Sequence, residues 1–107
     1  MVFKRAIFII LLLMISRNVV SAESYLSGTI SNITAVGGAL LIMLDSVLPT
    51  NCSGSPYNWM MIKKEETVMI SVVLMMWSTG NKNVTIYASG REHNGTGYCI
   101  VNQVDPH

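Results

Sequence analysis

The segment that most constrains the fold of this chain is its first 22 residues, which have the three parts of a secretory signal peptide. Lys4 and Arg5 give a positive start, residues 6–15 are apolar, and Val20-Ser21-Ala22 places small residues before a cleavage point. The apolar run is too short to cross a bilayer, which takes about 20 such residues. We expect cleavage after Ala22, export to the periplasm or the medium, and a mature chain without a membrane span. A retained interfacial anchor is the alternative.

Cleavage leaves residues 23–107, which is enough chain for one domain with one modest core. This remainder has four basic residues against six acidic ones, a net charge of −2, although the whole chain carries +1. Its only adjacent basic pair, Lys63-Lys64, is followed by two glutamates. Nucleic-acid binding needs a cluster of basic side chains that neutralises phosphates. We therefore expect no nucleic-acid partner.

The two cysteines, Cys52 and Cys99, both fall in the expected mature chain. In an oxidising compartment, a small even number of cysteines predicts a disulfide. Closing a loop of this length removes about 4 kcal/mol of unfolded-chain entropy. A metal site needs more Cys and His ligands nearby, and a redox pair needs the spacing C-x-x-C. Neither pattern occurs, so we expect no metal and no cofactor.

The sequence predicts five strands and one helix. Residues 68–77 are expected to form the helix, because two glutamates precede them and Gly80 suits a left-handed closing position. The β-branched residues within this run leave a buried strand as the alternative. Paired glycines favour a two-residue hairpin turn between the first two strands. Strands are expected over residues 28–36, 39–44, 57–62, 83–88 and 98–104.

This order of elements is that of a small five-stranded OB-like barrel with one apolar helix between strands 3 and 4, a mostly β (β+α) fold. The expected helix is apolar at every position except Ser71. A helix that is apolar all round is normally buried, yet so small a domain has little interior. We expect one face to pack on its own sheet and the opposite face on another copy of the chain. The residues expected at this homo-oligomer interface are Met69, Val72, Val73 and Met76. Residues 40–44 are also apolar on both faces, so we expect a helix or a partner to cover the outer one.

Three features together resemble the B subunits of AB5 toxins of the subtilase-cytotoxin and typhoid-toxin types. They are Cys52 before the helix, the run Trp77-Ser78-Thr79-Gly80 followed by Val84-Thr85-Ile86, and Cys99 on the final strand. The resemblance covers most of residues 23–107. In those B subunits a similar run ends the central helix, five copies form a ring with the helices lining the pore, and the outer barrel surface binds cell-surface glycans.

The resemblance implies a non-enzymatic protein that forms a homo-oligomer, binds a cell-surface glycan and partners a catalytic toxin subunit. The chain differs from those subunits in three ways. It is shorter, it lacks their additional cysteines, and it lacks their long aromatic-rich stretch near the C-terminus. No position matches their sugar-contacting residues, so no ligand-binding residue carries over. The alternative is a monomeric periplasmic or envelope protein with a structural or inhibitory role.

Catalysis is not expected, because His93 and His107 are the only histidines and neither has an evident nucleophile and orienting carboxylate. Recognition is expected in two polar loops, residues 45–57 and 89–97. Tyrosines and tryptophans offer either a stacking surface or core packing; they are Tyr57, Trp59, Trp77, Tyr87 and Tyr98. Asn83 and Asn94, each in an Asn-x-Thr sequence, look like exposed glycosylation acceptors if the source is eukaryotic.

Overall fold

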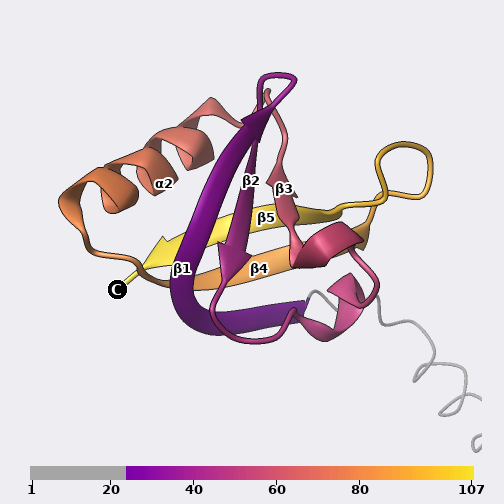
Figure 1. Cartoon of the computed structure of the whole chain (residues 1–107), viewed down its shortest axis with the longest axis horizontal. Coiled ribbons are helices and arrows are strands. Elements are labelled where there is room, and N and C mark those ends of the chain that lie inside the picture. Colours follow the sequence, from indigo (N-terminus) through magenta and orange to yellow (C-terminus); the bar gives the residue numbers. More distant parts are fainter. Residues whose placement is uncertain (1–23) are drawn as a thin grey trace, which may run out of the picture.

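The structure is a computed structural model that describes residues 24–107 (Figure 1). The expected signal peptide lies outside the described residues. The strands are β1 (Ser24–Val36), β2 (Ala39–Leu44), β3 (Met60–Ile62), β4 (Asn83–Arg91) and β5 (Cys99–Pro106). Helix α2 (Thr67–Thr79) connects β3 to β4, and two 3-10 turns, η1 (Thr50–Cys52) and η2 (Pro56–Asn58), lie between β2 and β3.

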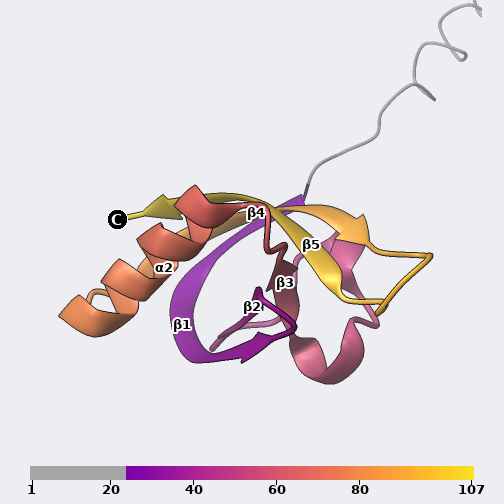
Figure 2. The same cartoon turned by 90° about the horizontal axis from the view of Figure 1, so that it is seen from above.

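Strand β1 closes the barrel because it pairs with two different strands. Residues 24–29 pair antiparallel with β4, whereas residues 30–36 pair antiparallel with β2, with a register shift between Ile30 and Asn32. Strands β3 and β5 run parallel and pair through Met60 with Cys99 and Met61 with Ile100. The resulting ring, β1-β2-β3-β5-β4, confirms the expected OB-like barrel (Figures 1 and 2).

Glycines permit two of the tight features of β1. Gly37 and Gly38 have φ values of 58° and 85°, which confirms the expected two-residue turn. At Gly28 a Cβ atom would lie 2.8 Å from the Ser46 hydroxyl oxygen, so a side chain there would displace the segment that follows β2. Close approach at this point lets the backbone N–H of Thr29 donate to the Asp45 carboxylate at 2.9 Å.

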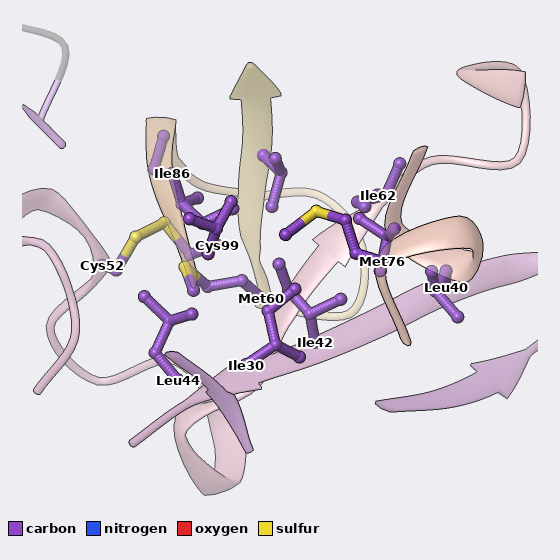
Figure 3. Close-up of a cluster of buried hydrophobic side chains, with 14 residues drawn as sticks. Ile30, Leu40, Ile42, Leu44, Cys52, Met60, Ile62, Met76, Ile86 and Cys99 are labelled. Atoms are coloured by element: carbon purple, nitrogen blue, oxygen red, sulfur yellow. A yellow bond between two sulfur atoms is a disulfide. The ribbon is translucent and has the colours of Figure 1, made fainter. Parts of the chain in front are cut away.

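Helix α2 confirms the expected helix and is slightly longer at both ends. It ends at Gly80, whose φ of 81° is the left-handed conformation that glycine adopts without strain. The hydroxyls of Ser78 and Thr79 donate to the Met75 carbonyl in the last turn. One face of the helix packs on the barrel core, where Val73 is fully buried and Met76 is 2% exposed. Figure 3 shows Met76 in one cluster with Ile42, Ile62 and the two cysteines.

Strand β2 is apolar on both faces; its inner face and Leu41 on the outer face are buried in the single chain, whereas Ala39 and Met43 on the outer face are half-buried. Leu40, Ile42 and Leu44 point into the core cluster. Leu41 lies on the other face, opposite Met61 of β3, and is only 2% exposed in the single chain. The expected outer cover is therefore not needed at Leu41, which is already shielded from solvent.

The expected third strand over 57–62 is too long. Only residues 60–62 form β3, and the preceding residues form η2. Pro56 suits the first position of such a turn, because its φ is fixed and it has no N–H to leave unpaired. Tyr57 and Asn58 then adopt left-handed φ values of 54° and 62°, which are incompatible with a strand.

The end of the chain also differs from expectation, because β5 continues to Pro106 rather than ending near residue 104. His107 follows it and is not a free tail. Its backbone N–H donates to the Asn83 carbonyl at 3.0 Å. The last residues thereby extend the sheet alongside β4.

Candidate functional site

The candidate site is the outer surface of β1, β4 and β5, which we call the tyrosine face. Along β1 and β4 alternate residues point into the core, as Ile30, Val84 and Ile86 do. The residues between them point outward and pair across the sheet. The outward residues that form the tyrosine face are Tyr25, Ser27, Thr29, Asn83, Thr85, Tyr87, Gln103 and Asp105, with His107 beside them.

Two tyrosines form the aromatic part of this face. Tyr25 lies directly opposite Tyr87 on β4, with ring centroids 5.5 Å apart and ring planes inclined at 34°. Tyr25 is 66% exposed, so a large part of its ring is accessible to a ligand. Gln103 lies opposite Tyr87 on β5 and continues the same row. The row therefore offers an aromatic surface with phenol and amide groups at its edges.

A second row consists of hydrogen-bonded polar groups. The hydroxyls of Ser27 and Thr85 share a hydrogen bond of 2.7 Å, and the Thr85 hydroxyl also pairs with His107 Nε2 at 2.8 Å. Asp105 lies opposite Thr85 on β5. Next to this row, the Thr29 hydroxyl donates to the Asn83 side-chain oxygen at 3.2 Å. The side chains of Ser27, Thr85, Thr29 and Asn83 are each bonded to a neighbour on another strand, so this part of the polar pattern is fixed before any ligand arrives.

The turn η1 anchors the N-terminal end of the tyrosine face. The hydroxyls of Ser24 and Thr50 pair at 2.9 Å, and the Asn51 side-chain amide donates to the Ala88 carbonyl at 2.8 Å. The Asn51 backbone N–H donates to the Ser24 hydroxyl at 3.3 Å, so Asn51 is bonded to both β1 and β4. Its half-buried amide is committed to the fold, unlike the exposed side chain of Asn94.

The tyrosine face carries groups that can stack on a ligand and form hydrogen bonds with it. Thr85 contacts an imidazole, but it is only 9% exposed and its oxygen already has two partners. The face instead combines an exposed aromatic ring with hydroxyl, amide and carboxylate groups. Stacking on a ring and many short polar contacts are the interactions that a sugar, with its apolar ring faces and hydroxyl edges, can make.

Sequence reasoning missed Tyr25 and Ser27, since the first strand was expected to begin at Gly28. The signal was present, because Tyr25-Leu26-Ser27 and Thr85-Ile86-Tyr87 alternate outward polar and inward apolar residues with the period of a strand. The sequence does not show which strands are neighbours. Only the register of β1 with β4 brings Tyr25 to Tyr87.

The two loops expected to carry recognition lie together at the end of the barrel beside β3. The disulfide between Cys52 and Cys99 confirms the expected bridge and joins the first loop to the start of β5, just after the second loop. Arg91 Nε donates to the Gly97 carbonyl at 2.9 Å. Its guanidinium also lies so close to Gly54 that a Cβ atom there would be 2.7 Å from it. The Ser55 hydroxyl contributes a further link, since it accepts from the Cys99 backbone N–H at 2.9 Å.

The four residues expected at an oligomer interface all contact the core of the single chain, fully or in part. Val73 and Met76 lie in the core of the single chain, and Met69 and Val72 pack partly against that core. The outward side of α2 instead presents Val68 at 75% exposure and Met75 at 58%. With Thr67, Ser71 and Val72 these two residues line a shallow groove. Sequence alone did not distinguish the two sides, because the helix is apolar on both.

The two histidines lie in different environments. His93 is exposed in the loop after β4, whereas His107 contacts Thr85. In the described part of the chain no three His, Cys, Asp or Glu side chains gather around a point where a metal ion would bind. Within residues 24–107, no helix is long and apolar enough to cross a membrane.

Comparison with protein-family profiles, with curated proteins and with solved structures gives no match. The barrel topology and the side chains themselves are therefore the basis for a functional assignment. They define a disulfide-linked, five-stranded OB-like barrel with a polar and aromatic outer face.

Proposed function

We propose that this chain is a secreted, non-enzymatic binding protein whose tyrosine face binds a carbohydrate, and that several copies assemble through α2. The proposal agrees with the resemblance to AB5 toxin B subunits, which also implies a catalytic toxin subunit as a partner. The observation that carries it is the exposed ring of Tyr25 beside Tyr87, next to the hydrogen-bonded row of Ser27 and Thr85.

The tyrosine face suits a sugar better than a charged or wholly apolar ligand. Among its side chains Asp105 is the one acid and His107 the one base, so it offers no cluster of like charges. Its hydroxyl and amide groups both donate and accept hydrogen bonds, as sugar hydroxyls do. Because the face is open, we expect weak binding at each single copy.

Assembly compensates for weak single sites, because linked copies bind a surface with many glycans far more tightly than one copy does. The outward side of α2 is the surface we assign to the contact between copies. Val68 and Met75 are large apolar side chains exposed on one helix, and burying such residues stabilises association. Light scattering on the purified, oxidised protein tests this, since a monomer at all concentrations contradicts assembly.

The carbohydrate proposal is tested on a glycan array, followed by titration of the strongest glycan against variants. Tyr25→Ala is expected to weaken binding at least tenfold, about 1.4 kcal/mol, because the stacking ring is removed. Tyr57→Ala is the matched control. It removes another exposed tyrosine, 85% accessible, that lies outside the tyrosine face.

Two outcomes contradict the carbohydrate proposal. One is that no glycan binds. The other is that Tyr25→Ala and Tyr57→Ala bind equally well, which places the ligand elsewhere.

A second candidate is a monomeric inhibitor-type protein of the periplasm or envelope, and the η2 region favours it. Tyr57 has a left-handed backbone conformation and is exposed. Val47 is 78% exposed and, with Gly54 and Asn58, lines part of a hollow. Exposed aromatic residues on a rigid support are typical anchors in protein interfaces. A monomer that loses its target upon Tyr57→Ala, but not upon Tyr25→Ala, supports this candidate instead.

A further inference from the structure

A further hollow, distinct from the groove on α2 and from the hollow near Val47, lies outside the tyrosine face and is lined by charged residues. It is lined by the β1–β2 turn, the outer side of β2 and β3, the β3–α2 connection and the start of the loop after β4. We call it the Lys63–Glu92 hollow, and its lining residues are Gly37, Ala39, Met61, Lys63, Lys64, Glu65 and Glu92. Its volume of about 320 Å³ is at the lower end of the range of small-molecule sites.

Both signs of charge meet across this hollow. Lys63 Nζ lies 3.7 Å from Glu92 Oε2, which is an ion pair but longer than a good hydrogen bond. Lys64 and Glu65 add a second charge of each sign on the same rim, and neither has an ion-pair partner among residues 24–107. The apolar side chains that line the hollow are those of Ala39 and Met61.

The Glu92 carboxylate is held in place by its own loop. Its Oε1 atom accepts from the Thr96 backbone N–H at 3.2 Å and from the Thr96 hydroxyl at 3.4 Å. The other oxygen, Oε2, faces Lys63 and has no hydrogen bond from the loop. Arg91, the preceding residue, is fixed from the opposite side through the Gly97 carbonyl. The acidic side of the hollow is therefore positioned, and Oε2, which forms the long ion pair with Lys63, is the oxygen that a ligand's ammonium group would compete for.

We propose that the Lys63–Glu92 hollow binds a small zwitterion, namely a short peptide or an amino acid with free amino and carboxylate ends. Its ammonium group would bind Glu92 Oε2, and its carboxylate would bind the Lys63 and Lys64 ammonium groups. A small aliphatic side chain would contact Ala39 and Met61. This site is separate from the tyrosine face, so the proposal stands whether or not a glycan binds there.

The probe is the dipeptide alanyl-alanine, titrated into the ¹⁵N-labelled, oxidised protein and followed by amide chemical shifts. Shifts are expected at residues 37–39, 61–65 and 92, with a dissociation constant on the order of 1 mM, because ion contacts at half-exposed sites are weak. Acetylation of the amino end, or amidation of the carboxyl end, is expected to weaken binding about tenfold, since each removes one charge.

Variants separate the two ends of the ligand. Glu92→Gln should abolish the discrimination between alanyl-alanine and its acetylated form, and Lys63→Gln should reduce the discrimination against the amidated form. Glu66→Gln and Lys82→Gln are charge-matched controls outside the hollow and should leave binding unchanged. Thermal unfolding of each variant verifies that it is folded.

Three results overturn the proposal. They are an absence of shifts at millimolar dipeptide, shifts that map outside the hollow, and equal binding of the free and capped dipeptides by the parent protein. A variant that fails to fold does not rescue the proposal, because the comparison of free and capped dipeptides is made on the unaltered chain.

Discussion

Loss of the disulfide between Cys52 and Cys99 is the perturbation whose size follows most directly from the structure. The two cysteines are 47 residues apart in sequence, so reduction frees a loop worth about 4 kcal/mol of unfolded-chain entropy. Domains of this size are stable by only about 5–15 kcal/mol. Reduction therefore removes a large share of the stability, and we expect the melting temperature to fall by about 15–30 °C.

The disulfide also stabilises the part of the barrel where two neighbouring strands share the fewest residue pairs. Strands β3 and β5 are joined by only two residue pairs, and Cys99 belongs to one of them. We expect amide exchange at Met60, Met61 and Ile100 to accelerate more than elsewhere when the bridge is reduced, because these two strands separate first.

Urea unfolding of the oxidised and the reduced protein measures the effect, and the Cys52→Ala/Cys99→Ala variant is the second comparison. The reduced protein keeps both sulfur atoms, whereas the variant also loses packing at two fully buried positions, so it should be the least stable of the three. The dependence on urea should steepen without the bridge, because the unfolded chain then exposes more surface. A loss below about 1 kcal/mol on reduction would refute the reasoning.

Four further substitutions, one of them also combined with Arg91→Ala, test other parts of the structure. Met76→Asp should cost more than about 3 kcal/mol in urea unfolding, because it buries a charge in the core, whereas Met75→Asp should leave the monomer folded and lower the mass of any assembly in light scattering. Gly54→Ala should cost about 1–2 kcal/mol, because its φ is +86° and the new methyl group would displace the Arg91 guanidinium; adding Arg91→Ala should recover the steric part. Gly80→Ala should cost about 1 kcal/mol by calorimetry, because alanine is strained at a φ of +81°.

Local signals in the sequence were sufficient for most elements of the barrel. The paired glycines at 37 and 38 predicted a turn that the structure has, and Gly80 predicted the end of α2. The disulfide was predictable as well, because two cysteines allow only one bridge. Each of these features depends on the conformational preference or chemistry of the residues themselves.

The length of the third strand was wrong for a local reason, whereas the packed side of α2 and the tyrosine face depend on distant parts of the chain. The aromatic and apolar residues 57–62 resemble a strand, but Pro56 begins a turn and the strand is only three residues long. The choice between the two apolar sides of α2 depends on where the barrel core lies, which no pattern within the helix encodes. The tyrosine face was hidden for a similar reason, because it forms only when β1 meets β4.

The division of β1 between two neighbours has a consequence for how the barrel and its ligand affect each other. Ser27 and Thr85 are 58 residues apart in sequence, and they become neighbours only when the first half of β1 completes the ring. A molecule bound across Tyr25, Tyr87 and Gln103 would therefore bind only the closed ring, and by mass action it would raise the free energy needed to open it. Under the proposed function, ligand binding to the outer face and closure of the barrel around its core would therefore be thermodynamically linked.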